Sequence, residues 1–341
     1  MTVTGETLKA GGSAKKGGCR LCPRDCGTKR EAGQTGVCGQ TDMLKVARAA
    51  LHYWEEPCIS GEAGSGTVFF SGCALHCVFC QNKEIADGTA GKYITVERLA
   101  EIFLELQGQQ ANNVNLVTPG HFVPQIKKAL DKAKRQGFLL PVVYNTGSYE
   151  SVENIRSLEG YIDVYLPDLK YKDAALSAKY SHAPDYFLHA GQAIAEMVRQ
   201  TGEPRFVPES VLTDSIISGE ERWKHVQWMT PEEMEDAEGT SILVRGTVVR
   251  HLLLPGCLSD AKGIIKYLLD TYGDKIYISL MSQYTPAQHL PDYPELGRRV
   301  TEREYEALLD YAIELGINLG FIQDGEAAEE SFIPAFDGYG I

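Results

Sequence analysis

The 341-residue sequence has no long apolar run and no excess of positive charge. No apolar stretch approaches the roughly 18–20 residues of a membrane-spanning helix, so we expect no membrane association. Lysine and arginine number 33 against 46 aspartate and glutamate residues, and the formal net charge is -13. Nucleic acids and anionic membrane surfaces are bound through basic surface, so this balance argues against both kinds of partner.

Residues 1–18 also lack the apolar segment of a signal peptide and are rich in glycine, lysine and alanine. We expect a flexible tail there. The chain has nine cysteines, and seven of them fall into two tight groups. Such grouping is typical of reduced metal ligands rather than of disulfides, and it predicts a cytoplasmic location.

One group, Cys73, Cys77 and Cys80, directly follows the apolar and β-branched run 67–70. The run predicts a buried strand, so the three thiols lie on the loop that leaves its C-terminal end. Thiolates bind zinc and iron–sulfur clusters, and both usually take four protein ligands. Because no fourth cysteine lies nearby, we expect one metal position to be left for a small molecule. A partial zinc site and three unligated core cysteines are the alternatives.

The other group, Cys19, Cys22, Cys26 and Cys38, stands in a segment with glycine and proline but almost no aliphatic residues. Such a segment cannot build a hydrophobic core, so we expect a bound metal to hold it together. Zinc and an iron–sulfur cluster both suit four thiolates, and the cluster is slightly favoured. Four unligated thiols are the remaining alternative. We call residues 19–38 the knuckle.

From residue 67 onward, strand-like and helix-like patterns alternate. Strands are expected at 67–70, 113–118, 141–145, 161–166, 247–254 and 275–281. Thr95 is expected to cap one helix, and Thr301 with Glu304 forms a capping box before another. Repeated strand–helix units predict an α/β fold with a parallel sheet and helices outside it.

The expected domain organisation follows this alternation. The knuckle and a linker cover 19–60, a barrel covers 61–325 and a C-terminal tail covers 326–341. Residues 203–241 interrupt the barrel with ten acidic side chains against three basic ones. We expect a solvated surface insertion there, with a lid or a partner-docking surface as the alternative. In the linker, we expect Glu55 and Glu56 to be solvated, with contact to a substrate as the alternative. We expect Cys58 to be a small core residue, with ligation at either metal site as the alternative.

Polar side chains follow several of the expected strands. In an α/β barrel, ligands bind at the C-terminal ends of the strands, and this rule selects candidate binding residues. They are Asn115, Thr118, His121, Asn145, Ser148, Asp168, Lys170, Arg250, His251, Ser282 and Gln283. A surface ion pair between Asp168 and Lys170, and core hydrogen bonding by His121 or His251, are the structural alternatives.

The spacing of Cys73, Cys77 and Cys80, with the aromatic Phe79 before the last of them, resembles the hallmark of the radical S-adenosylmethionine superfamily. The superfamily's Gly-Gly-Glu-type motif after the second strand is missing, and residues 117–121 stand in its place. The sequence therefore departs from the superfamily pattern where the amine of the cofactor would be held.

Two further segments sharpen the resemblance. Residues 168–170 (Asp-Leu-Lys) and 249–256 look like segments of the pyruvate formate-lyase-activating-enzyme group, where they lie in the cofactor site. The knuckle cysteines are similar to those of an uncharacterised branch of the same group. The resemblance spans roughly residues 19–325, without the acidic segment. It implies a partial (β/α)6 barrel of the TIM-like radical S-adenosylmethionine type.

The resemblance also implies a catalytic site. Cys73, Cys77 and Cys80 would hold a [4Fe–4S] cluster whose open iron binds S-adenosylmethionine. The resemblance places Asp168, Lys170 and Arg250 in the site of that cofactor. Together with the residues at the strand ends and on the cysteine loop, the expected contacts of the cofactor are Phe79, Asn82, Thr118, Asn145, Asp168, Lys170, Arg250 and His251. One electron would then cleave the cofactor to methionine and a 5′-deoxyadenosyl radical, which abstracts hydrogen from a substrate.

The implied substrate is a glycine of a partner enzyme of the glycyl-radical type, with a flavodoxin- or ferredoxin-type protein as electron donor. The alternative is radical modification of another peptide, protein or small molecule. A non-catalytic iron–sulfur or zinc protein is the alternative from a different class. The knuckle would hold either a second cluster or zinc.

Overall fold

The structure is a computed structural model that describes residues 17–219, 221, 224–230, 233–234, 239–286, 290–317, 319–323 and 334–341. Its strands are β1 (Lys45–His52), β2 (Ser65–Phe70), β3 (Lys92–Tyr93), β4 (Val114–Val117), β5 (Val142–Thr146), β6 (Val164–Pro167), β7 (Arg205–Pro208), β8 (Ser241–Leu252), β9 (Tyr277–Met281) and β10 (Gly320–Gln323). Its α-helices are α1 (Pro57–Ser60), α2 (Lys83–Ala86), α3 (Val96–Gly108), α4 (Val123–Arg135), α5 (Val152–Arg156), α6 (Ala174–Ser181), α7 (Tyr186–Thr201), α8 (Glu209–Ser218), α10 (Leu258–Tyr272) and α11 (Glu302–Glu314). Most of the tail expected at 1–18 lies outside the described residues.

The strands β2, β4, β5, β6, β8 and β9 lie side by side in chain order, and each pairs in parallel with the next. β10 continues the sheet in parallel beyond β9, while β1 and β3 add antiparallel strands at the opposite edge. The predicted α/β fold with a mostly parallel sheet is confirmed. Because β3 and β10 are the edge strands of this sheet, it is open, as a partial barrel is.

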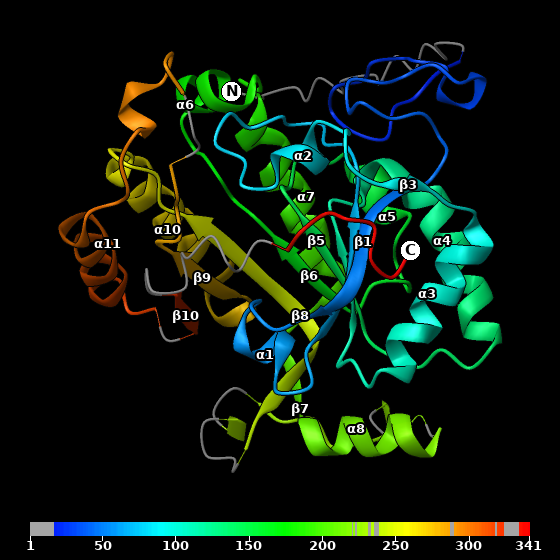
Figure 1. Cartoon of the computed structure of the whole chain (residues 1–341). Coiled ribbons are helices and arrows are strands. Elements are labelled where there is room, and N and C mark those ends of the chain that lie inside the picture. Colours follow the sequence, from blue (N-terminus) through cyan, green and yellow to red (C-terminus); the bar gives the residue numbers. More distant parts are fainter. Residues whose placement is uncertain are drawn as a thin grey trace, which may run out of the picture.

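Helices cover the outer face of the sheet, with α3 and α4 on one flank and α10 and α11 on the other (Figure 1). Leu99 and Phe103 of α3 and Ile126 and Leu130 of α4 are fully buried. Their spacing of four residues places each pair on one face of its helix, which is the face that packs on the sheet. These buried helix faces therefore form the outer core.

The predicted helix starts at Thr95 and Thr301 are both formed. The Thr95 side chain accepts a hydrogen bond from the backbone N–H of Arg98, and Thr301 with Glu304 forms the full capping box. These bonds satisfy donors that the first turn of a helix leaves unpaired. No helix in the described part of the chain is both long enough and apolar enough to cross a membrane.

On the inner face of the sheet, one level of side chains is apolar, and the next level along the strands, toward their C-terminal ends, is polar. The apolar level packs against Cys58 and Ile59 of α1, and its strand residues include Val143, Leu166 and Val248. Side chains two residues further along a strand point to the same face. The polar side chains at that second level are Asn145, Asp168 and Arg250. Helix α1 and its apolar partners thus form a floor beneath these polar groups, and Cys58 is a buried core residue as expected.

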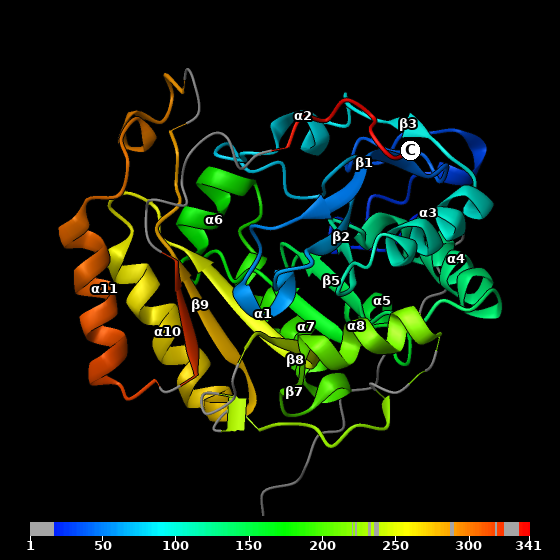
Figure 2. The same ribbon diagram turned by 60° about the horizontal axis from the view of Figure 1, so that its bottom comes forward.

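The expected linker contains a strand. Residues 45–52 form β1, which runs antiparallel to β2 and so brings His52 beside Ser65 at the start of β2. The described C-terminal residues lie along β1 as well. The backbone N–H of Gly338 donates to the carbonyl oxygen of Ala47, and the backbone N–H of Ala49 donates to the carbonyl oxygen of Tyr339. Figure 2 shows this terminal segment in red, crossing near α2 toward β3.

The first part of the acidic segment belongs to the core. β7 pairs antiparallel with the first half of β8, which is why β8 begins earlier than the sequence predicted. Phe206 of β7 and Leu212 of α8 are fully buried. The expectation of a solvated insertion is therefore wrong for residues 205–218. Residues 220, 222–223, 231–232 and 235–238 of this segment lie outside the described residues.

Glu209, the first residue of α8, shows how this segment is anchored. Its buried carboxylate accepts hydrogen bonds from the backbone N–H groups of Glu62 and Ala63, at 3.0 and 2.9 Å. The Asn112 amide donates to the same carboxylate at 2.6 Å. The carboxylate thus joins α8 to the turn that leads into β2.

We expect Glu209→Ala to lower the free energy of unfolding by about 2–4 kcal/mol, because three donors lose a charged acceptor. Denaturant unfolding followed by circular dichroism measures this loss. Glu203→Ala is the matched control, since Glu203 is exposed and its Oε2 lies 3.6 Å from Arg205 in a surface pair. The control should change stability by less than about 0.5 kcal/mol, and equal losses in the two variants would contradict the anchoring role.

Candidate active site

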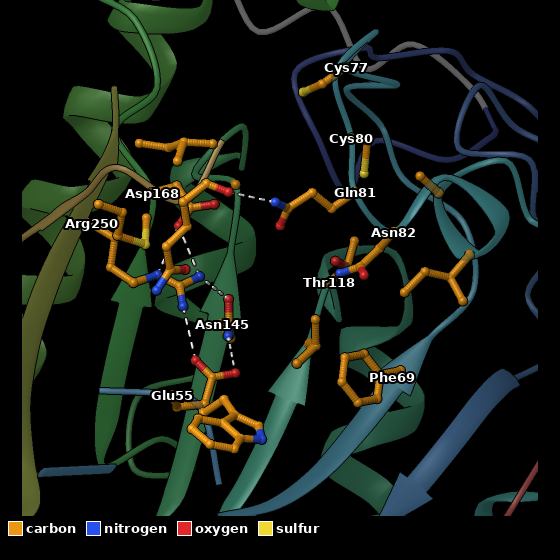
Figure 3. Close-up of a pocket in the computed structure, with 18 of the residues that line it drawn as sticks. Glu55, Phe69, Cys77, Cys80, Gln81, Asn82, Thr118, Asn145, Asp168 and Arg250 are labelled. Carbon is orange, nitrogen blue, oxygen red and sulfur yellow. Dashed lines mark hydrogen bonds and ion pairs between the residues drawn. The ribbon is translucent and has the colours of Figure 1, made fainter. Parts of the chain in front are cut away.

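A cavity of about 630 Å³ lies inside the curve of the sheet, above the floor formed by α1. Cys77 and Cys80 lie at one end of it and Glu55 at the other, with Arg250, Asp168 and Asn145 between them (Figure 3). A volume of this size suits a cofactor or a small-molecule ligand. The cysteine loop and the polar level of the strands therefore face the same space.

The three thiols of the loop lie close enough to influence one another. Cys77 is buried, and the Ser181 hydroxyl donates a hydrogen bond to its Sγ at 3.0 Å. Burial, together with the neighbouring Cys77 and Cys73, raises the pKa of Cys80 to about 12. Burial likewise raises the pKa of Cys77, while Lys170 opposes that effect. Metal binding needs thiolates, so a bound metal would have to displace these protons.

Phe79 fixes the loop to the protein core. Its ring makes edge-to-face contacts with the rings of Tyr171, Tyr180 and Tyr284, at centroid distances of 6.3, 6.4 and 6.4 Å. Such geometry is favourable for aromatic pairs, and Phe79 is 6% exposed. The aromatic residue before the last cysteine thus packs on three tyrosines and still lines the cavity.

Arg250 is the centre of the polar level. Its Nε donates to Asp168 Oδ1 at 2.9 Å, and its Nη1 and Nη2 donate to Glu55 Oε2 at 3.0 Å and Asn145 Oδ1 at 2.6 Å. Lys170 Nζ donates to the second oxygen of Asp168 at 2.7 Å. The planar guanidinium is suited to several simultaneous contacts of this kind. One arginine therefore ties β5, β6 and β8 to the segment after β1.

The charges in this network do not balance, because three carboxylates face two cations. Glu56 is the third carboxylate, and its Oε2 lies 3.9 Å from Arg250 Nη1. Burial raises the pKa of both Glu55 and Glu56, although Arg250 opposes the effect. For Asp168, burial also acts to raise the pKa, but Arg250 and Lys170 outweigh it and the pKa is lowered. Asp168 is thus the carboxylate that both cations hold in its charged form.

Most of the residues predicted from the sequence line the cavity. They are Cys73, Cys77, Cys80, Phe79, Asn82, Thr118, Asn145, Asp168, Lys170, Arg250 and Gln283. Thr118 has a positive φ of 56°, a conformation that is uncommon for residues other than glycine. That backbone conformation occurs where the superfamily motif is missing from the sequence.

His251 does not line the cavity, contrary to the prediction. Successive residues of a strand point to opposite faces, so Arg250 and its neighbour His251 cannot both face the cavity. The His251 ring is buried, with Nδ1 2.8 Å from the carbonyl oxygen of Leu169. His121 is also buried outside the cavity, with Nε2 2.7 Å from the Ser71 carbonyl oxygen. Both histidines follow the structural alternative rather than the ligand role.

The sequence did not predict the acidic wall of the cavity, which is formed by Glu55 next to the buried Glu56. Glu55 and Glu56 were expected to be solvated, but their side chains are only 10% and 1% exposed. Trp54 and Tyr53 line the cavity together with Glu55. The signal that could have found this wall is β1, because a strand over 45–52 places the next few residues at the edge of the sheet.

Gly72 joins the cysteine loop to the knuckle. Its φ is 94°, and a methyl group added to it would lie 2.5 Å from the carbonyl oxygen of Cys38 and 2.5 Å from Gln40 Cγ. We expect Gly72→Ala to displace the knuckle, because the Cys38 backbone has no flexible end that can move aside. Backbone strain alone should cost about 1–3 kcal/mol of unfolding free energy.

Thermal unfolding and iron content measure the effect of Gly72→Ala. Gly108→Ala is the control, since Gly108 is in α3 with nothing within 4 Å of the added methyl group. The control should be neutral or stabilising by up to about 1 kcal/mol. A Gly72→Ala protein as stable as this control would contradict the close contact.

Comparison with known proteins identifies one domain family. Residues 59–181 match the model of a 4Fe–4S single cluster domain. The match is to an iron–sulfur domain. It contains Cys73, Cys77 and Cys80 and excludes the knuckle. The uncharacterized protein MJ0674 of Methanocaldococcus jannaschii is 25% identical over 308 residues, which cover 88% of this chain and 76% of that protein.

Solved structures with a distant likeness include two larger proteins. SuiB of Streptococcus suis, bound to its precursor peptide SuiA, is 11% identical with a TM-score of 0.45 and matches 74% of this chain. HydG, a maturase of the [FeFe]-hydrogenase, is 12% identical with a TM-score of 0.45 and matches 79% of this chain. The chain spans about half of these proteins, 46% of SuiB and 53% of HydG.

Proposed function

We propose that this chain is a radical S-adenosylmethionine enzyme. The observation that carries the proposal is the position of Cys73, Cys77 and Cys80, which open onto a cavity of about 630 Å³ whose wall carries Lys170 and Arg250. The match of residues 59–181 to a 4Fe–4S single cluster domain supports it. The resemblance of the cysteine motif, which lies within that match, to the superfamily supports it as well.

The residues fit the two cofactors. Three soft thiol ligands on one loop suit an iron–sulfur cluster and leave one iron without a protein ligand. Lys170 and Arg250 suit the carboxylate of S-adenosylmethionine, while Asn145 and Asp168 suit its ribose hydroxyls. When bound, a [4Fe–4S] cluster supplies one electron that cleaves this cofactor to methionine and a 5′-deoxyadenosyl radical, which takes hydrogen from the substrate.

The chain's own part in this reaction is to position and to exclude water. Arg250, Asp168 and Asn145 hold one another in place before any ligand enters, so little ordering is needed on binding. The floor of Cys58, Ile59 and their apolar partners closes the cavity from below and keeps water away from the reacting groups.

For the substrate, we propose a glycine of a glycyl-radical-type partner enzyme. The resemblance of segments 168–170 and 249–256 to the activating enzymes supports this assignment. The electron donor would be a flavodoxin- or ferredoxin-type protein. We also propose a cytoplasmic location, because cysteines that serve as metal ligands must stay reduced. Electron paramagnetic resonance of a candidate partner, after incubation with the reduced enzyme and S-adenosylmethionine, should show a glycyl radical. If none of the glycyl-radical enzymes tested acquires a radical, the proposed role as an activating enzyme is contradicted.

The reaction class is tested by the nucleoside product. Anaerobically reconstituted protein, reduced with dithionite, should convert S-adenosylmethionine to 5′-deoxyadenosine and methionine, as measured by liquid chromatography. Omission of dithionite is the control and should abolish the product. Protein with a full complement of iron and sulfide that forms no nucleoside, and whose spectra do not respond to S-adenosylmethionine, would overturn the proposal.

A further inference from the structure

The C-terminal end of α6 lies against the cysteine loop. The backbone N–H of Val78, in that loop, donates to the carbonyl oxygen of Tyr180 at 2.9 Å. Arg24 of the knuckle joins the same two segments. Its Nε donates to the carbonyl oxygen of Ala74 at 2.8 Å, and its Nη2 donates to that of Ser181 at 2.9 Å. Main-chain and arginine contacts therefore hold the end of this helix in a fixed place beside the loop.

Ser181, the last residue of α6, directs its hydroxyl at one of the three thiols. Its Oγ donates to Cys77 Sγ at 3.0 Å, and both residues are buried. By comparison, Cys73 Sγ accepts a hydrogen bond of 3.4 Å from the backbone N–H of Leu75 in the same loop. The donor to Cys77 is thus a side chain from outside the loop, and a single substitution can remove it.

The Ser181 hydroxyl is itself held by Tyr171. The Tyr171 hydroxyl lies 2.8 Å from Ser181 Oγ, and Tyr171 is fully buried. A hydroxyl group has one hydrogen, and that of Ser181 is directed at Cys77, so Tyr171 is the donor in this second bond. The ring of Tyr171 packs edge-to-face on Phe79 of the loop. Two buried hydroxyls therefore form a chain that ends on the sulfur, and bonds in such a chain strengthen one another.

A hydrogen bond to a ligand sulfur changes the reduction potential of an iron–sulfur cluster. Reduction adds one negative charge, and part of this charge falls on the sulfur ligands. A donor aimed at a ligand sulfur stabilises the reduced state more than the oxidised state, because the reduced state is the more negative one. Such a donor therefore raises the potential, and its removal lowers it.

We propose that Ser181 sets the reduction potential of the cluster on the cysteine loop by donating a hydrogen bond to the ligand sulfur of Cys77. Tyr171 is the positioning residue that orients this hydroxyl. This role rests on the proposed function, since it requires a cluster on that loop. It extends the proposed function to two residues outside the cysteine motif, which control how readily the site accepts the electron from its reductant.

A potentiometric titration followed by electron paramagnetic resonance tests this role. The full chain is reconstituted without oxygen and reduced with dithionite, and the signal of this cluster is the one that changes when S-adenosylmethionine is added. In Ser181→Ala the ratio of reduced to oxidised cluster at a fixed potential should fall about tenfold, which is about 59 mV for a one-electron couple. Tyr171→Phe should lower the potential by less, because the Ser181 hydroxyl remains.

Ser177→Ala is the matched control. Ser177 is buried in the same helix, and its hydroxyl donates to the carbonyl oxygen of Ala174 at 3.1 Å. This variant loses a buried hydroxyl but no donor to a sulfur, so its potential should equal that of the unaltered chain. An equal shift in Ser177→Ala and Ser181→Ala would overturn the role of Ser181. If Ser181→Ala does not keep its iron, an unaltered potential in Tyr171→Phe overturns that role instead.

Different results distinguish a wrong function from a wrong role of Ser181. If the unaltered chain, fully loaded with iron and sulfide, shows no signal that responds to S-adenosylmethionine, the proposed function is wrong and the role of Ser181 falls with it. If the signal responds but the potential is the same in the unaltered chain, Ser181→Ala and Tyr171→Phe, only the role of Ser181 is wrong.

Discussion

Cys77→Ala should lose one cluster, about four iron atoms per chain, and should form no detectable 5′-deoxyadenosine. Two remaining thiols in a loop cannot hold a cluster that needs three, and Cys77 is the thiol that also accepts the Ser181 hydrogen bond. Removing one small sulfur atom from the core should cost only about 1 kcal/mol of stability, so the protein remains folded. Iron and sulfide analysis and nucleoside chromatography measure the two effects.

Cys58→Ala is the control for this variant. Cys58 is 3% exposed and lies in the apolar floor, outside the residues that line the cavity. It should lose a similar amount of stability and keep both its iron and its nucleoside product. If Cys77→Ala kept a full iron content and formed the nucleoside, the assignment of the cysteine loop would be wrong.

Arg250→Ala should have the second largest effect, on stability and on binding together. Without Arg250, the carboxylates of Glu55, Glu56 and Asp168 face Lys170 alone. Removing one partner of a buried ion pair costs about 3–5 kcal/mol, because the remaining charges stay buried without compensation. Denaturant unfolding should show a loss of this size. Calorimetric titration of the reconstituted protein should show that the affinity for S-adenosylmethionine is lost as well.

Two further variants separate charge from a general loss of structure. Adding Glu55→Gln to Arg250→Ala should recover part of the stability, since one uncompensated carboxylate is removed. Arg245→Ala, on the same strand, is the matched control, because its guanidinium donates to the Thr201 and Gln200 carbonyl oxygens near the surface. It should cost about 1 kcal/mol and leave binding unchanged. Equal effects at positions 245 and 250 would contradict the central role of Arg250.

The sequence predicted those parts of the fold that depend on local patterns. The helix caps at Thr95 and Thr301 and the β-branched runs of the parallel strands depend on near neighbours in the chain, and the structure forms them. β1 and β7 are antiparallel strands, and they were missed because neither has the long apolar run by which a buried parallel strand is recognised.

The same distinction holds for the candidate site. Residues at the C-terminal ends of parallel strands, such as Asn145 and Asp168, were found because the fold class alone places them at one edge. The burial of Glu55 was harder to predict, since its ion-pair partner Arg250 lies 195 residues later in the chain. The error at His251 was avoidable, because the alternation of side chains along a strand already excluded it once Arg250 was chosen.

The contact between Glu55 and Arg250 makes ligand entry an exchange reaction. A carboxylate from the chain already occupies the guanidinium that an incoming acid would need. The displaced Glu55 must then find a new partner or take up a proton. Breaking the contact between Glu55 and Arg250 therefore lowers the net affinity for the ligand. A mildly acidic pH would favour binding of the ligand, because it would protonate Glu55. An amine of the ligand would pair with the displaced Glu55 carboxylate. The cavity is therefore expected to favour zwitterionic ligands over simple anions.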